Sequence, residues 1–157
     1  MKVRRHHRLQ ADEAARPRVC EDAAYSLLEE ARLNCEELLA RADTSDQHSG
    51  LQRLHRELGL AGFVVSSNIS SVRRRRLLEA ARERCEAQIA HAPTSLHELD
   101  AVAKRAERAV EDAFVSPGLT DHVHLAHIHG LRALELLTAM LRPCSSKMSR
   151  DRAAPGS

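Results

Sequence analysis

Aromatic side chains are scarce in this chain of 157 residues, which contains no tryptophan, one tyrosine and two phenylalanines. Sandwiches and barrels need many β-branched and aromatic residues on their pleated faces, so the composition argues against both classes. It also argues against aromatic cages for cationic ligands and stacking platforms for single-stranded nucleic acid, because both kinds of site need several π-faces.

Segments that would direct the chain into a membrane or out of the cell are also missing. No run of 18 apolar residues occurs, and the basic residues near the N-terminus are not followed by an apolar stretch. We therefore expect neither a membrane span nor a secretory signal. These absences predict a cytoplasmic protein that has no membrane partner.

The four cysteines, Cys20, Cys35, Cys85 and Cys144, form no CxxC pair. In a reducing compartment we expect them to be small buried apolar residues and not a disulfide framework or a zinc site. A glycine-rich phosphate loop, a nucleophile elbow and an HExxH sequence are absent as well. The sequence therefore assigns no catalytic residue.

Alanine and leucine dominate the residues that are present, with 24 and 21 copies. Both are strong helix formers and poor strand formers, which predicts an all-α fold. A chain of about 150 residues buries roughly 70% of its unfolded surface, which is enough for one domain with a real core. Residues 1–19 carry six basic and two acidic residues, and residues 143–157 carry three basic and one acidic residue. We predict that these basic tails are disordered and flank a single all-α domain over residues 20–142.

An internal repeat with an offset of 50 residues is the clearest feature of the sequence. Residues 26–45 and 76–95 are identical at eleven of twenty positions, which is more than a shared amphipathic pattern requires. The identity predicts a duplicated helical hairpin, with repeat one over residues 20–66 and repeat two over residues 70–116.

Apolar residues recur in both repeats with the 3.6-residue period of helices that are buried on one face. The stripes in repeat one are Leu27, Leu28, Ala31, Cys35, Leu38, Leu39 and Ala42, and then Leu51, Leu54, Leu58, Ala61 and Val65. Those in repeat two are Leu77, Leu78, Ala81, Cys85, Ile89 and Ala92, and then Leu99, Val102, Ala106, Ala109, Val110 and Ala113. Ser95 and Glu98 predict a capping box before the last of these helices. With one residue inserted, Phe63 aligns with Phe114, which predicts two equivalent aromatic anchors.

A fifth helix, over residues 121–142, closes the predicted helical bundle of about five helices and ends before Pro143. Its main apolar stripe is placed on Val123, His127, Leu131, Leu134, Leu137 and Leu141. Leu125, Leu136 and Met140 lie outside this stripe, so the helix is apolar on more than one side. This pattern predicts a central position or an oligomer interface.

Four of the ten histidines lie in this fifth helix: His122, His124, His127 and His129. Only His124 and His127 have a spacing that lets two imidazoles on one helix converge on an ion, so they are the candidate ligands of a transition metal. Such a site would need Asp, Glu or Cys from another helix. The segment around His127 is also loosely similar to the accepting segment of histidine phosphotransfer domains, with its glycine one residue early. Packing or surface histidines are the simpler interpretation.

Arg73, Arg74, Arg75 and Arg76 form the densest run of charge, at the start of a predicted helix. The N-terminus of a helix carries partial positive charge, so an anionic partner, nucleic acid or the acidic faces around residues such as Glu107 would relieve the repulsion. A solvated turn is the simpler interpretation. No recognition helix for DNA is evident, and binding to nucleic acid is not favoured.

Together these features favour a small, non-enzymatic helical module that binds a protein partner or forms a homo-oligomer. Seams of alanine and leucine with charged flanks suit such helix–helix contacts. A His-based site on the last helix, for metal binding or phosphotransfer, is the alternative, and association with nucleic acid is a second alternative. No cofactor is expected unless the histidines bind a transition metal.

Overall fold

The computed structural model describes residues 2–114 and 120–142, with side chains for residues 21–113 and 124–142. The described residues form a bundle of five α-helices and no strand. The helices are α1 (Lys2–Ala40), α2 (Ser45–Val65), α3 (Ser71–His91), α4 (Leu96–Phe114) and α5 (Thr120–Leu141). The predicted all-α class and the number of helices are confirmed.

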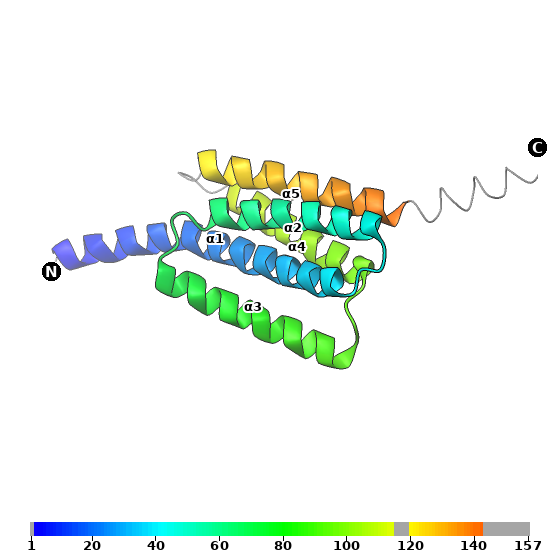
Figure 1. Ribbon diagram of the computed structural model, residues 1–157. Coiled ribbons are helices and arrows are strands. Elements are labelled where there is room, and N and C mark those ends of the chain that lie inside the picture. Colours follow the sequence, from blue (N-terminus) through cyan, green and yellow to red (C-terminus); the bar gives the residue numbers. More distant parts are fainter. Residues whose placement is uncertain (1, 115–119, 143–157) are drawn as a thin grey trace, which may run out of the picture.

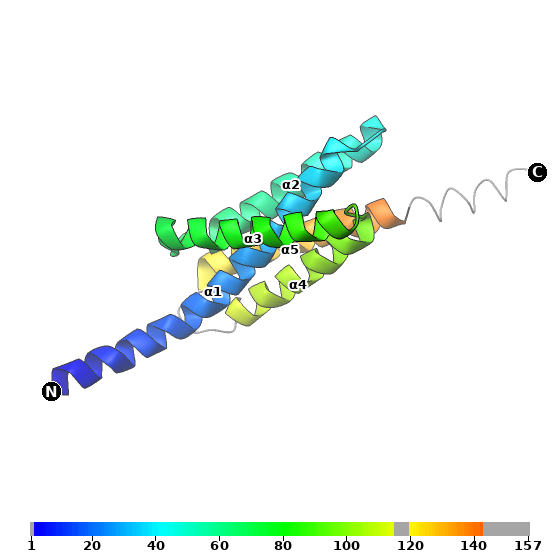
Figure 2. The same cartoon turned by 90° about the horizontal axis from the view of Figure 1, so that it is seen from below.

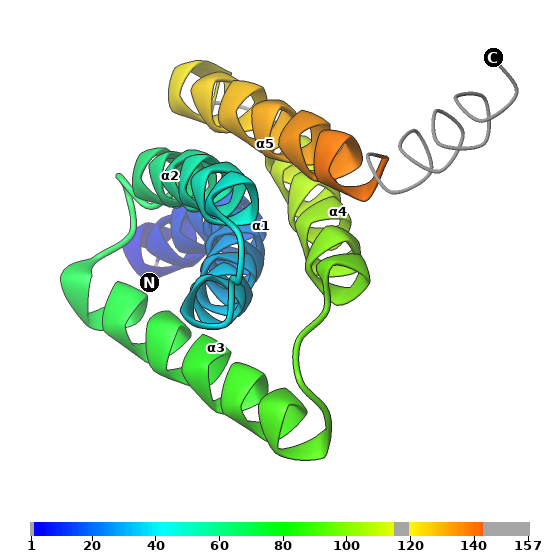
Figure 3. The same cartoon turned by 45° about the vertical axis from the view of Figure 1, so that its right-hand side comes forward.

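Helices α1, α2, α4 and α5 form the body of the bundle, and neighbouring helices run in opposite directions (Figure 1). The helix α1 packs on α2 and on α4, and α5 packs on the same two helices from the far side. The helix α3 lies outside this group, and its extensive contact is with α1 (Figure 3). Among the described residues, α1 is therefore the central helix, because α2, α3 and α4 all cover it.

The two predicted hairpins are not equivalent in the structure. Helices α1 and α2 of repeat one pack on each other, but α3 and α4 of repeat two do not pack along their lengths, and both lie against α1 instead. A closed second hairpin over residues 70–116 is therefore wrong for the described part of that range. The reason lies in α3, whose buried residues are only Ala81 and Cys85, too few for an apolar face toward α4 as well as α1.

The buried stripes of three helices agree with their predicted positions. The predicted residues of α2 and α4 are all buried, and those of α1 are buried or packed against the core at half-buried positions. The largest fully buried apolar side chains are Leu28, Leu54, Leu58, Leu99 and Leu137. The core thus lies between α1, α2, α4 and α5.

The buried face of α5 differs from its predicted stripe. Ala126, Gly130, Ala133 and Leu137 face the bundle, whereas Leu131 is 42% exposed. Small residues let a helix approach its neighbours closely, so the inner face of α5 is the face with the small side chains and not the face with the most leucines. Of the residues that the sequence places outside the main stripe, Leu136 and Met140 pack against the core and Leu125 is 45% exposed.

The predicted aromatic anchor in repeat one is also wrong. Phe63 is 72% exposed, because it lies on α2 between residues of the buried stripe and points away from the core. The side chain of Phe114 lies outside the described residues. The exposure of Phe63 gives no support to the prediction that Phe63 and Phe114 are equivalent anchors of the two repeats.

Side-chain caps fix the starts of three helices. The backbone N–H of Glu98 donates to Ser95 Oγ at 3.2 Å and that of Ser95 to Glu98 Oε2 at 3.4 Å, which confirms the predicted capping box. Thr44 caps α2 and Ser70 caps α3 in the same manner, by accepting a hydrogen bond from a backbone N–H three residues later.

The backbone of residues 2–19 is helical and continues α1 beyond the bundle (Figure 2). The predicted disorder of this tail stays a prediction. Arginine and alanine are frequent in this segment, and both favour a helix. The predicted C-terminal tail, residues 143–157, lies outside the described residues.

Candidate functional site

The histidines of α5 face different neighbours. His127 forms an ion pair through Nδ1 with Glu107 of α4, and His129 Nδ1 lies 2.6 Å from Oε2 of Glu57, on α2. His124 is exposed, and the side chain of His122 lies outside the described residues. The group of possible metal ligands in the described part of the chain includes His127 and not His124, and the predicted pair of His124 and His127 stays a prediction.

Glu107 is the ion-pair partner of His127, and the two residues together form the candidate site. The side chain of Glu107 is only 6% exposed, and it lies between α4 and α5. Burial raises the pKa of the Glu107 carboxyl to about 7, while His127 opposes this shift and Glu111 adds to it. A carboxyl group in this environment changes its protonation state near neutral pH, where an ordinary glutamate is always ionised.

Gly130 accommodates the Glu107 carboxylate. A Cβ atom at this position of α5 would collide with Oε2 of Glu107 and would lie 3.2 Å from its Cδ. The space that the glycine leaves is therefore already filled by the carboxylate. It does not open an approach to His127 of the kind that a phosphotransfer histidine requires.

The acidic residue Glu111 completes a cluster on α4. It lies one helical turn after Glu107 and is exposed, and one ligand atom each from Glu107, Glu111 and His127 lie within 4.8 Å of one another. This group joins a buried, a half-buried and an exposed side chain from two helices.

The arginines at the start of α3 are partly neutralised within the chain. Arg73 forms an ion pair with Asp22 of α1. Burial raises the pKa of Tyr25, and the positive charge of Arg74 opposes this shift. Arg75 and Arg76 are exposed. The predicted role of Arg73 to Arg76 in binding an anion or a partner stays a prediction. Asp22 already supplies a negative charge to Arg73 within the chain.

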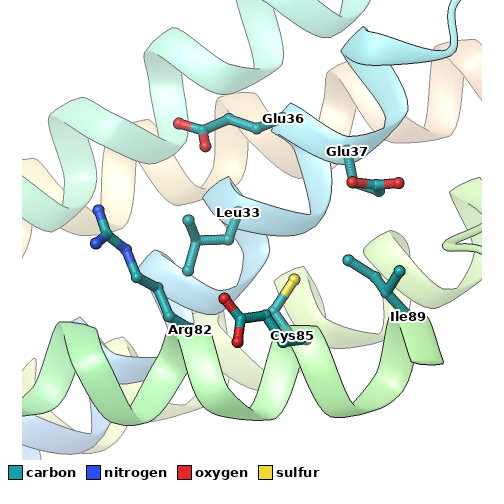
Figure 4. Close-up of a pocket in the computed structure, with 7 residues that line it drawn as sticks. Leu33, Glu36, Glu37, Arg82, Cys85 and Ile89 are labelled. Carbon is teal, nitrogen blue, oxygen red and sulfur yellow. The ribbon is translucent and has the colours of Figure 1, made fainter.

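A hollow between α1 and α3 contains Cys85 (Figure 4). Its other lining residues are Leu33, Glu36, Glu37, Arg82, Glu86 and Ile89. The Cys85 thiol donates to Asn34 Oδ1 at 3.2 Å, and burial together with nearby glutamates, Glu30 first, raises its pKa. A protonated thiol is a poor nucleophile, so the raised pKa argues against a nucleophilic role for Cys85.

Cys35 is buried, as we expect for cysteines that serve as small apolar residues of the core. It is fully buried and donates to the carbonyl oxygen of Leu51 at 3.2 Å. Cys35 and Cys85 are both free thiols. Cys20 and Cys144 lie outside the described side chains.

The outer face of α5, which we define by Leu125, Leu131, Arg132, Glu135 and Ala139, is turned to solvent. Leu125 is 45% exposed and Leu131 is 42% exposed. A shallow hollow beside Leu131 is lined by Leu131, Leu134, Glu135, Thr138, Ala139 and Arg142. This face combines exposed leucines with one basic and one acidic residue three positions apart.

Comparisons with known proteins assign no family to these features, since no family model matches the chain and no similar protein was found among curated sequences or solved structures. Among the described helices, none has both the length and the apolar character needed to cross a bilayer. Function must therefore be argued from the geometry.

Glu107 is the residue that the sequence analysis misplaces, because it assigns this acid to a charged outer face. One signal for its burial is present in the sequence. Glu107 follows Ala103 by four residues and precedes Val110 by three, so it lies within the apolar stripe of α4. An acidic residue inside such a stripe needs a partner on the facing helix, and here the partner is His127.

Proposed function

We propose that this chain is a small, non-enzymatic helical module that forms a homodimer through the outer face of α5. The observation that carries the proposal is the exposure of Leu125 and Leu131 beside a shallow apolar hollow on a helix whose other sides are packed. Exposed leucines on one face of a helix cost free energy in water and favour burial against a partner.

The charges on this face support a second copy of the chain as the partner. Arg132 and Glu135 both lie on the exposed face, and neither forms an ion pair with another described residue. When two copies of α5 pack antiparallel about a two-fold axis between these positions, Arg132 of each copy faces Glu135 of the other. The surface is thus complementary to itself, as a two-fold interface requires.

The composition of the face also favours protein over nucleic acid as the partner. Its centre is Leu131, and the charged residues around it are Arg132, Glu135 and, at the end of the hollow, Arg142, so its excess of positive charge is a single residue. Binding to a phosphate backbone needs a basic surface. The exposed arginines Arg75 and Arg76 lie on a different helix, α3.

Light scattering on the purified chain over a range of concentrations tests the dimer. We expect wild type to shift from monomer to dimer as its concentration rises, and Leu131→Glu to stay monomeric. Val72→Glu is the matched control, because Val72 is 61% exposed on α3 and should not affect dimerisation. A wild-type chain that is monomeric at every concentration contradicts the proposal.

A charge exchange tests the orientation of the two copies. Arg132→Glu and Glu135→Arg should each weaken the dimer, because each places like charges opposite each other. Mixed in equal amounts, the two variants should form a heterodimer, and the double variant should dimerise like wild type. Single variants that dimerise as well as wild type exclude the antiparallel arrangement.

A further inference from the structure

Three side chains with metal-binding atoms converge between α4 and α5, on the inner side of α5 and away from its outer face. Glu107 and Glu111 lie four residues apart on α4 and therefore on the same side of that helix. His127 of α5 faces them, and one ligand atom from each of the three lies within 4.8 Å of the others. Ligand atoms around a tetrahedral Zn²⁺ are about 3.4 Å apart, so the three groups are close enough to share one ion after their side chains adjust.

Glu107 is buried without the hydrogen bonds that a carboxylate usually receives. Apart from its contact with His127, neither of its oxygens accepts a hydrogen bond from a described residue. A buried ionised carboxylate is costly unless several donors or a cation compensate it. A further positive group at Glu107 would compensate this cost.

The fold makes a specific place for this carboxylate. Gly130 lacks the Cβ that would collide with Glu107 Oε2, so the backbone of α5 passes close beneath the acid. Glycine in the interior of a helix costs about 1 kcal/mol relative to alanine. The structure accepts this cost at a position where any larger residue would displace Glu107 from His127.

From this arrangement we infer that Glu107, Glu111 and His127 form a binding site for a divalent transition-metal ion of the Zn²⁺ type. One imidazole nitrogen and two carboxylate oxygens are ligands that Zn²⁺ accepts, whereas Mg²⁺ and Ca²⁺ prefer oxygen alone. Three protein ligands leave the fourth position to water. Glu107 supplies a buried anion, His127 a neutral imidazole, and Glu111 a ligand at the solvent-facing edge of the site.

Calorimetric titration of the full chain, stripped of metal by a chelator, with ZnCl₂ tests the inference. We expect one tight Zn²⁺ site per chain and a raised melting temperature in its presence. Glu111→Gln should weaken this site by about 10- to 100-fold or more, a loss at least as large as that caused by removing outer-shell groups from known sites. Because Glu111 is exposed, this variant should fold like wild type without metal.

Matched controls separate the site from other histidines and acids of the chain. His48→Ala, on α2, and Glu83→Gln, on α3, remove exposed groups of the same chemistry elsewhere and should leave the tight site unchanged. His127→Ala should abolish tight binding, and Co²⁺ substituted for Zn²⁺ should lose its visible absorption bands in the same variants.

The competing interpretation is a metal-free pair in which Glu107 and His127 share a proton and hold α4 against α5. On that interpretation, His127→Ala lowers the melting temperature, and Glu111→Gln changes nothing. Equal Zn²⁺ affinity for wild type and Glu111→Gln overturns the metal site, as does a wild-type chain without a tight Zn²⁺ site.

Discussion

The carboxylate of Glu107 occupies the space that the missing side chain of Gly130 leaves on the inner face of α5. The two residues are on facing helices, and each position restricts the other. A glutamate can be buried at this crossing only because a glycine faces it. The same pair therefore determines both how closely α4 and α5 pack and where the carboxylate meets His127.

Gly130→Ala is expected to destabilise the fold, although alanine is normally the better helix former. The added Cβ collides with Glu107 Oε2, and overpacking of this kind costs about 1–3 kcal/mol. Denaturant unfolding of wild type and variant measures the difference in the free energy of unfolding.

Gly59→Ala is the matched control for this change. Gly59 also lies inside a helix, α2, but a Cβ there would have only Arg32 Cδ nearby, at 3.8 Å. This variant should therefore gain about 0.5–1 kcal/mol from the higher helix propensity of alanine. Equal effects at both positions would contradict the described packing of Glu107.

The buried thiol of Cys35 predicts a loss of stability in alkaline solution. Burial, with a contribution from Glu36, raises its pKa from 9.0 to about 12. Between these values the unfolded chain has released the proton and the folded chain has kept it, so unfolding becomes more favourable as pH rises. The expected slope is about 1.4 kcal/mol per pH unit between the two pKa values.

Comparison with Cys35→Ala isolates this effect, because every other titrating group is common to both proteins. Urea unfolding between pH 8 and pH 10.5 measures the free energy of unfolding of both proteins. The difference between wild type and variant should become smaller above about pH 9. Parallel curves over this range would mean that the Cys35 thiol is accessible to hydroxide in the folded state.

The attachment of α3 depends on an ion pair with α1. Arg84 Nε donates to Glu30 Oε1 at 3.0 Å, and its Nη2 donates to Ser26 Oγ at 2.6 Å. Glu30 is only 7% exposed at its side chain, and its other cationic neighbour, Arg105, is 4.0 Å away. Arg84→Ala should therefore cost about 1–2 kcal/mol, toward the low end because Arg84 is itself partly exposed.

Hydrogen exchange locates this loss within the molecule. Amides of α3 should exchange faster in Arg84→Ala, while those of α2 should change much less, because α3 has few apolar contacts to hold it. Arg75→Ala, which removes an exposed arginine of the same helix, is the control and should behave like wild type. A uniform increase over all helices would show that α3 and the bundle unfold as one unit.

The period of apolar residues was sufficient to predict the helices and most of the core. Leu54 and Leu58 on α2 and Leu99 on α4 are buried as their spacing indicates, because amphipathic patterning records which face of a helix meets the core. The Ser95 and Glu98 capping box was also predictable, since both partners lie within one turn and need no tertiary information.

The faces of α5 and the burial of Glu107 required the three-dimensional structure. Counting leucines places Leu131 in the core, but close approach to α2 and α4 selects the face with Ala126 and Gly130. The pairing of Glu107 with His127 joins residues from two helices, and no local pattern determines which helices become neighbours. The same limit explains why the repeat did not reveal that α3 and α4 are separated by α1.

The central position of α1 also determines the order in which the chain can fold during synthesis. The helix α4, which covers more of α1 than any other helix does, begins only at Leu96, after α2 and α3 have been made. At ~5–20 residues per second, a ribosome needs roughly 3–11 s to pass from the end of α1 to the start of α4. During that interval the apolar side of α1 that α4 will cover is available to chaperones and to other nascent chains.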